Sequence, residues 1–278
     1  MINAFTVDVE DWFHICGTDN GKAKFSNWDN CEDRVVGNTV FLLKILREYN
    51  TKATFFFLGW IAEKHPELVL EVKKNGHEIA THGYAHKLIY EQTSEEFTKD
   101  LKKSVNIIEK ITNEKILGYR GPGFSITEKS LWALKIIGKC GLRYDSTVFP
   151  TEQDHGGLKS AELYPYLINI EKNSKIWEFP MSIAQVLGGK VPFAGGGYLR
   201  LFPYWFIKHS IKKINKKGKP AIIYVHPREV DIKQPRMNLP LYRRFKYYVN
   251  LKTVEGKIRA LLSDFKFAPA SKVLELTK

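Results

Sequence analysis

The sequence predicts a single α/β domain in which parallel strands alternate with helices. Short runs of β-branched and aromatic residues alternate with segments of helical periodicity along the whole chain, an order typical of parallel strands joined by helical crossovers. No linker rich in proline, glycine or serine divides the 278 residues. The chain therefore folds as a closed or distorted barrel or as an open doubly wound sheet, and the absence of GxGxxG after the first strand weakens the second alternative.

The first elements are two strand–helix pairs. Residues 3–10, "NAFTVDVE", are rich in strand-forming residues and end in carboxylates. Residues 34–49, "RVVGNTVFLLKILREY", repeat their apolar positions at helical spacing. Residues 52–59, "KATFFFLG", form an apolar run that predicts a buried strand, and residues 66–76, "PELVLEVKKNG", predict a helix that ends in lysines and a glycine.

The remaining elements repeat this pattern. The helix at 93–111 begins with Thr93 and Glu96 at capping-box spacing, and Ser125 and Glu128 have the same spacing before the next helix. Strands are expected at residues 77–82, 116–120, 142–147, 176–182 and 220–226, and further helices at residues 128–141, 203–218 and 253–265.

Composition limits the classes of function. The net charge of +13 favours anionic partners such as phosphorylated or nucleotide-linked sugars, acidic glycolipids or a membrane face, although a solvated lysine-rich surface explains it equally well. The basic run "KKINKKGK" lacks the interleaved aromatic residues of a nucleic-acid surface, so no nucleic-acid partner is expected. Three cysteines without a CxxC pattern argue against a disulfide framework or a cysteine zinc site.

The sequence also indicates a location. The N-terminus "MINAFTVDVEDWF" lacks a basic start followed by an apolar run, and no stretch of 18 apolar residues occurs. We therefore expect a cytoplasmic protein. The helix "YWFIKHSIKKINKK" has two interpretations, a basic helix on a membrane surface or a helix buried against the barrel, and the second is favoured.

Titratable residues collect where the predicted strands end. In a parallel barrel these ends lie on one face, where active sites are built. The residues concerned are Asp8, Glu10, Asp11, His82, His86, Arg120, Asp145 and His226.

The histidine pair in "ATHGYAH" suggests a metal site. His82 and His86 are four residues apart, close to one helical turn, so both imidazoles can face one point. The pair alone does not separate metal binding from packing, but two imidazoles with a carboxylate are a common catalytic zinc set. Side chains alternate along a strand, so Asp8 and Glu10 share one side. Glu10 is favoured as ligand and Asp8 as base, with the reverse order as the alternative. Asp11 either caps a turn or joins the site, where it is the other candidate for the carboxylate ligand.

Five motifs in order resemble a known family. "TVDVEDWF", "HGYAH", "RGPGF", "YDS" and "YVHP" are similar to the successive motifs of the polysaccharide deacetylases, the NodB-homology or carbohydrate esterase family 4 group. "FTVDVEDWF", "GGGYLRLFP" and "VHPREVD" resemble the branch with an extended C-terminal segment found in exopolysaccharide and O-antigen gene systems.

The resemblance implies a fold and a set of roles. The fold is a distorted (β/α) barrel of NodB-homology type over residues 1–278, with 232–278 as a C-terminal extension packed on it. His82 and His86 match the histidine ligands of a divalent metal, with Zn²⁺ expected first and Co²⁺ or Ni²⁺ as alternatives, and Glu10 supplies the carboxylate. The other matches are Asp8 as catalytic base, Arg120 as the arginine that orients it, His226 as catalytic histidine and Asp145 as the acid that supports His226.

The expected reaction is removal of an N-acetyl or related N-acyl group from an amino sugar in surface polysaccharide or O-antigen biosynthesis. The sugar is expected to be nucleotide- or lipid-linked, with peripheral membrane proximity as one consequence. Two alternatives stay open, a related amidohydrolase acting on a small non-sugar amide and a catalytically silent carbohydrate-binding barrel. "GGGYLR" is either a substrate loop or a simple chain reversal.

Overall fold

The computed structural model describes residues 1–15, 28–153, 155–171 and 174–277. Its strands are β1 (Ile2–Val9), β2 (Thr54–Phe57), β3 (Glu78–Thr81), β4 (Gly118–Tyr119), β5 (Tyr144–Asp145), β6 (Tyr166–Glu171), β7 (Ser174–Glu178), β8 (Ile183–Val186), β9 (Gly189–Pro192), β10 (Ile222–Val225) and β11 (Lys266–Ala268). Its α-helices are α1 (Val35–Glu48), α2 (Gly59–Lys64), α3 (Pro66–Lys74), α4 (Ser94–Thr112), α5 (Trp132–Lys139), α6 (Gly196–Leu201), α7 (Tyr204–Lys216), α8 (Leu241–Tyr248), α9 (Val254–Asp264) and α10 (Ala270–Val273).

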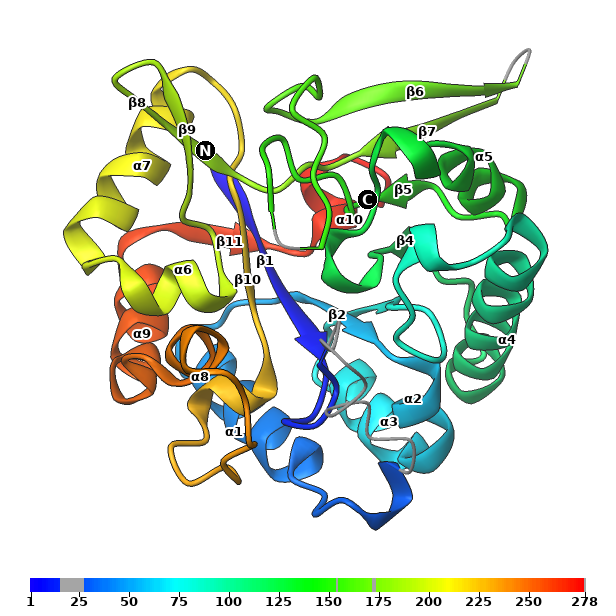
Figure 1. Ribbon diagram of the computed structural model, residues 1–278, viewed down its shortest axis with the longest axis horizontal. Coiled ribbons are helices and arrows are strands. Elements are labelled where there is room, and N and C mark those ends of the chain that lie inside the picture. The colour runs from blue at the N-terminus through cyan, green and yellow to red at the C-terminus, as the bar shows by residue number, and fades with distance from the viewer. Residues whose placement is uncertain (16–27, 154, 172–173, 278) are drawn as a thin grey trace.

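A mostly parallel sheet forms the centre of the molecule. Its strand order is β10-β1-β2-β3-β4-β5-β7-β6, and β11 also pairs with β1. All of these pairs are parallel except β6 with β7, and β8 and β9 form a separate antiparallel hairpin. Helices surround the central strands, with α2, α3 and α4 on one side and α6, α7 and α9 on the other (Figure 1).

The sheet closes into a distorted barrel through contacts that are not regular strand pairs. Beyond β10, Gly195 forms an isolated parallel bridge with Tyr224. The backbone N–H of Ile222 donates to the hydroxyl of Ser182, 2.8 Å away, at the other end of the same strand. Irregular backbone thus replaces a strand at this position, and the predicted distorted (β/α) barrel is confirmed.

The register of the strands sets where the site lies. Thr6 of β1 pairs with both Thr54 of β2 and Tyr224 of β10, so these strands run in step. Phe57 then pairs with Thr81 at the end of β3. The carboxyl ends of neighbouring strands therefore lie at one edge, and polar residues that follow these strands meet there.

An apolar core holds the strands and helices together. The Phe55 and Phe57 side chains of β2 are fully buried, as is Val7 of β1, and they belong to the same core cluster as Leu101 of α4 and Ile211 of α7. Because burial of each such side chain contributes roughly 1.5–3 kcal/mol, this cluster explains why short strands suffice for a stable sheet.

Several local predictions are refined by the structure. The capping box at Thr93 and Glu96 is present at the start of α4. The cap before α5 is formed by Thr127 and Ser130, not by Ser125 and Glu128, because the chain makes a short 3-10 turn there first. "GGGYLR" is not a simple reversal, since most of it forms the short helix α6, and several of its residues line the pocket described below.

Helix α7 packs against the barrel. Its residues Ile207, Ser210, Ile211 and Ile214 are buried, which agrees with the favoured interpretation of this basic segment. Among the described residues, no helix has both the length and the apolar character needed to cross a bilayer.

Candidate active site

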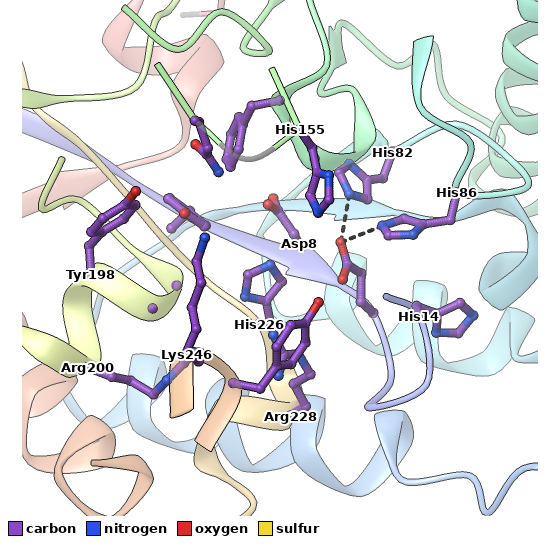
Figure 2. Close-up of a pocket in the computed structure, with 18 of the residues that line it drawn as sticks. Asp8, His14, His82, His86, His155, Tyr198, Arg200, His226, Arg228 and Lys246 are labelled. Atoms are coloured by element: carbon purple, nitrogen blue, oxygen red, sulfur yellow. Dashed lines mark hydrogen bonds and ion pairs between the residues drawn. The ribbon is translucent and has the colours of Figure 1, made fainter. Parts of the chain in front are cut away.

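A pocket opens at the carboxyl ends of the strands. Its described lining comes from the strand ends, from α6 and from α8, so both halves of the sequence contribute to it (Figure 2). The residues that line the pocket include Asp8, Glu10, His14, His82, His86, Gly123, His155, Tyr198, Arg200, His226, Arg228, Arg243, Lys246 and Tyr247.

Glu10, His82 and His86 form a compact cluster of ligand atoms. One oxygen of Glu10, Oε1, lies 2.9 Å from Nε2 of His82 and 2.9 Å from Nε2 of His86. The three ligand atoms all lie within 4.8 Å of one another, and all three residues are buried. Figure 2 shows both imidazoles directed at this carboxylate. The three side chains predicted as metal ligands are therefore together.

A loop, not a helix, brings the two histidines together. The segment after β3 contains two residues in the left-handed region, Gly83 at φ 73° and His86 at φ 51°. Asp100 of α4 accepts hydrogen bonds from the backbone N–H groups of Tyr84 and Ala85, at 2.7 and 3.0 Å. The prediction that a helical turn brings His82 and His86 together is therefore wrong. They lie in a turn that hydrogen bonds to Asp100 hold in place.

The donor set fits a divalent cation. Nδ1 of His82 lies 2.7 Å from the backbone carbonyl of Arg120 and donates to it, so Nε2 presents a lone pair to Glu10. Burial alone would raise the pKa of Glu10, but His86, His226 and His82 hold that pKa well below its usual value. An ionised carboxylate facing an imidazole lone pair repels it unless a positive charge lies between them.

Asp8 lies beside this cluster and is held by Arg120. The Nη1 of Arg120 donates to Asp8 Oδ1 at 2.6 Å and to Thr6 Oγ1 at 2.8 Å. Both residues of the ion pair are buried. Ser146 fixes the rest of the guanidinium, because its carbonyl accepts from Nε and its hydroxyl accepts from Nη2. Arg120 therefore has the contact with Asp8 that the resemblance implied.

Asp11 has the capping role left open by the sequence. Its Oδ2 accepts hydrogen bonds from the backbone N–H groups of Arg34 and Val35, at 2.7 and 2.9 Å, at the start of α1. Its Oδ1 accepts from the N–H of Trp12. With both oxygens used in this way, Asp11 is directed away from the ligand cluster, and Glu10 is the carboxylate that faces the histidines.

His226 lines the pocket, but Asp145 is not its partner. Nδ1 of His226 lies 3.3 Å from Oε2 of Glu229, and the same oxygen accepts the backbone N–H of His226 at 3.0 Å. In the described part of the chain, no hydrogen bond or ion pair joins Asp145 to His226. Nδ1 of His226 has no hydrogen-bond partner in the described part of the chain, but Glu229, three residues after the histidine, lies within ion-pair distance of it, whereas no contact with Asp145 is present there.

Asp145 is bound elsewhere in the sheet. Its carboxylate accepts from the hydroxyl and the N–H of Thr147, and it faces Glu178 across the β5–β7 pair. Burial and the nearby Asp145 raise the pKa of Glu178 well above its usual value, so Glu178 stays protonated and can share its proton with Asp145. This pair supports the strand ends beneath Arg120 and Ser146.

The buried position of His226 also sets its charge. Burial lowers the pKa of His226 to about 4; Glu10 and Asp8 oppose the shift, and Arg228 and Arg200 add to it. The ring is therefore neutral at neutral pH in the resting protein. Since Nδ1 faces Glu229, Nε2 is the nitrogen available to a substrate.

Two groups of lining residues have no role in the sequence-based assignment. His14 accepts the N–H of Asp11 at Nδ1, so its Nε2 carries the proton and, among the described residues, has no hydrogen-bond partner. The second group is basic and comes from the C-terminal half of the chain: Arg200, Arg228, Arg243 and Lys246. Only the position of Arg228, two residues beyond His226, was a signal in the sequence.

Two family models match adjacent parts of this chain. Residues 17–144 match the polysaccharide deacetylase model, and residues 146–275 match a domain of unknown function, DUF3473. The first match contains the histidine pair and Arg120, and the second contains His226 and the basic lining residues. The second match begins well before residue 232, so it includes β6 to β10 as well as the predicted extension.

Characterised relatives share part of the chain. A peptidoglycan-N-acetylglucosamine deacetylase of Bacillus cereus is 28% identical over 134 residues, 48% of this chain and 60% of the relative. A peptidoglycan deacetylase of Helicobacter pylori is 28% identical over 170 residues, 61% of this chain and 56% of the relative. A chitooligosaccharide deacetylase of Azorhizobium caulinodans is 25% identical over 105 residues, 38% and 49% of the two chains. The chain thus spans less than two thirds of each relative.

Solved structures share the fold. A protein from Mycobacterium smegmatis described as a polysaccharide deacetylase superposes with a TM-score of 0.61 at 20% identity, over 99% of this chain and 89% of that chain. An allantoinase gives a TM-score of 0.58 at 15% identity, over 86% and 71%. A pseudoenzyme of the same carbohydrate esterase family from Bacillus anthracis gives 0.53 at 14% identity, over 98% and 65%. The fold alone therefore does not decide among these activities.

Proposed function

We propose that the chain is a member of the polysaccharide deacetylase family, whose model matches residues 17–144, and that it is a metal-dependent hydrolase that removes an N-acetyl or related N-acyl group from an amino sugar. One observation carries the proposal. Glu10, His82 and His86 converge on one point, and an Asp8–Arg120 ion pair lies in the same pocket. This arrangement combines a cation site with a positioned carboxylate base.

Glu10, His82 and His86 are the residues that hold the cation, with Zn²⁺ as first candidate and Co²⁺ or Ni²⁺ as alternatives. When bound, the cation supplies Lewis-acid activation of an acyl carbonyl and of water. Asp8 accepts the proton of the attacking water at its carboxylate. Arg120, with Nη1 2.6 Å from Asp8 Oδ1, fixes the orientation of that carboxylate and favours its ionised form.

Departure of the amine requires a proton. His226 lines the same pocket, and its neutral ring would receive at Nε2 the proton that Asp8 takes from the attacking water and then deliver it to the leaving nitrogen, while Glu229 beside Nδ1 stabilises the imidazolium. The backbone N–H of Gly123, in the left-handed region at φ 63°, is the candidate donor to the oxyanion. No step requires a serine or cysteine nucleophile.

Relatives support an acylated amino sugar as the substrate. Those named above act on peptidoglycan or chitooligosaccharide, and these polymers share an N-acetylated sugar. We place the reaction in surface polysaccharide or O-antigen synthesis, on a nucleotide- or lipid-linked sugar at the cytoplasmic side of a membrane. The net charge of +13 and the basic residues of the pocket favour such an anionic carrier.

The two other activities remain testable alternatives. A small non-sugar amide suits the same ligand set and corresponds to the allantoinase neighbour. A silent binding barrel corresponds to the pseudoenzyme neighbour. The coincidence of the ligand cluster, the Asp8–Arg120 pair and His226 in one pocket favours an enzyme over the silent barrel.

Metal analysis with a deacylation assay tests the proposed function. The purified chain should contain close to one divalent ion per molecule and release acetate from N-acetylated sugars, and chelation should abolish release until metal is restored. The matched control is Asp29→Asn, an exposed carboxylate outside the pocket, which should leave both properties unchanged. Acetate release that persists without metal contradicts the proposal, as does a metal-loaded protein inactive on a broad panel of N-acyl sugars.

A further inference from the structure

The basic wall of the pocket consists of Arg200, Arg228, Arg243 and Lys246. Figure 2 shows Arg200, Arg228 and Lys246 on the opposite side of the pocket from His82 and His86. Within the described lining of the pocket, the only carboxylates are Asp8 and Glu10, and both belong to the metal-ligand side.

Arg200 of the basic wall is paired with a buried carboxylate. Arg200 is buried and forms an ion pair with Glu229, which is itself fully buried. Its Nη2 also donates to the backbone carbonyl of Lys246 at 2.7 Å. Arg200 is therefore tied into the structure, and Glu229 is used by Arg200 and His226 together.

Arg228 has no such partner. It is only 7% exposed, yet its Nε and Nη1 have no hydrogen-bond partner among the described residues, and no carboxylate there pairs with it. The flat guanidinium lies 4.6 Å from the centre of the Tyr247 ring, which holds it in place. Buried cations are normally paired, and Arg228 lines the pocket, so an anion bound there would supply the partner that this side chain lacks among the described residues.

Helix α8 completes the basic wall. Arg243 and Lys246 line the pocket from this helix, and Nη2 of Arg243 lies 3.2 Å from Nε2 of His155. The other face of α8 is exposed and carries three large apolar side chains beside Arg244, with Leu241, Tyr242 and Phe245 being 83, 68 and 58% exposed. The pocket face of α8 is thus basic, whereas most of its exposed side chains are apolar.

We propose that Arg228, together with Arg243 and Lys246, forms a subsite that binds an oxyanion carried by the substrate, a phosphate or carboxylate group attached to the amino sugar. The rigid fork of a guanidinium matches both anions with two parallel hydrogen bonds, and lysine adds a mobile charge. The inference rests on the proposed function for the identity of the sugar, but the binding of the anion does not depend on turnover.

Direct binding of three sugars tests the subsite. Calorimetry compares methyl N-acetylglucosaminide, N-acetylglucosamine 1-phosphate and N-acetylmuramic acid, in an Asp8→Asn background so that no ligand is consumed. At least one charged sugar should bind about tenfold or more tightly than the neutral one, the effect of one charge-assisted hydrogen bond. Comparison of the sugar phosphate with the sugar carboxylate identifies which anion the protein recognises. A lipid-linked sugar phosphate in detergent is a further ligand to compare, suggested by the exposed apolar residues of α8.

Substitution of Arg228 separates recognition from folding. Arg228→Gln should reduce the preference for the charged sugar to within about twofold while leaving affinity for the neutral sugar unchanged, and Arg228→Lys should retain part of the preference. Arg244→Gln is the matched control, because Arg244 is exposed on α8 and does not line the pocket. Thermal melting of each variant verifies that it is folded.

The outcomes separate the subsite from the proposed function. Equal affinities for charged and neutral sugars in the parent protein overturn the subsite, and so does a preference that survives in folded Arg228→Gln protein. In the parent enzyme, loss of the preference should appear in KM for the charged sugar with kcat retained. Charged-sugar preference without any acetate release would leave the subsite standing and contradict the N-deacylase proposal.

Discussion

The two walls of the pocket differ in how their charges are balanced. On the metal-ligand side, Arg120 Nη1 lies 2.6 Å from Asp8 Oδ1, and Glu10 Oε1 lies 2.9 Å from the Nε2 atoms of His82 and His86, the atoms that would share a cation with it. On the basic wall, the one buried carboxylate, Glu229, pairs with Arg200 and His226, while Arg228 is buried without a carboxylate among the described residues.

This difference separates chemistry from recognition. A balanced wall is arranged before substrate arrives, as expected of groups that must move protons at fixed positions. A buried guanidinium without a carboxylate partner, such as that of Arg228, lowers its energy when an anion binds, as expected of the proposed subsite. The walls also come from different sequence regions, since the ligand histidines fall in the deacetylase match and the basic residues in the DUF3473 match.

The largest effect is expected on the metal-ligand side. Asp8→Asn removes the base while retaining the shape of the side chain, and kcat should fall by about 10²–10⁴, the usual contribution of a general base. Metal content, measured by elemental analysis, should stay at the parent level. If the variant keeps full kcat, Asp8 is not the base, and the assignment of proton transfer to the metal-ligand side of the pocket is contradicted.

Loss of a ligand should be almost as severe but different in kind. His86→Ala leaves two of three ligand atoms, so metal affinity should drop by at least about 100-fold, measured by competition with a chelating dye. Addition of excess metal should restore part of the acetate release. The exposed His209 is a suitable control, because His209→Ala does not touch this pocket. Unchanged affinity in His86→Ala would exclude His86 as a ligand.

Substitution of two carboxylates, Glu229 and Asp145, tests which of them accompanies His226. Glu229 contacts His226, whereas Asp145 contacts Thr147 and Glu178. Glu229→Gln should reduce kcat by about tenfold and shift the pH dependence of kcat, because the charge beside the imidazole is lost. Asp145→Asn should lower stability without shifting that pH profile. The opposite result would restore Asp145 as the partner of His226 and remove Glu229 from that role.

The smallest effect lies outside both walls and concerns stability. Burial, with Lys52 nearby, lowers the pKa of His77 from 6.5 to about 4, and Nδ1 accepts the N–H of Ala53. The native state therefore keeps this ring neutral. Its contribution is fully present above the unfolded pKa of 6.5 and is lost as the pH falls through that value toward 4.

An asparagine at position 77 isolates this contribution. His77→Asn retains an acceptor for Ala53 but does not titrate, so the free energy of unfolding should fall less between neutral pH and about pH 5, by roughly 2 kcal/mol. Urea unfolding followed by circular dichroism measures the difference. Equal acid sensitivity of variant and parent would show that His77 is not protonated on unfolding in this range.

Much of the fold follows from local patterns in the sequence. The alternation of strands and helices, the capping box at Thr93 and the buried strand at 52–59 were all predictable, because they depend on neighbouring residues along one element. The convergence of Asp8, Glu10, His82, His86 and His226 was also predictable, because parallel strands place their carboxyl ends at one edge.

The partners of individual side chains were not predictable in this way. The β6 and β8–β9 strands, the helix at "GGGYLR" and the basic wall depend on where the chain returns to the sheet after residue 146. Spacing suggested a helical turn for the two histidines, but Asp100, on another element, fixes the loop instead.

The amino-acid sequence by itself predicted the alternation of parallel strands and helices and the side of β1 that carries Asp8 and Glu10, because periodicity and strand direction are local properties. The resemblance to a family implied the barrel and the proposed ligand residues. Only the tertiary structure decided that Glu229 and not Asp145 accompanies His226, and that Arg228 is buried without a carboxylate partner among the described residues. Electrostatic partners are set by distances of a few ångströms between segments far apart in the chain, and no sequence pattern encodes those distances.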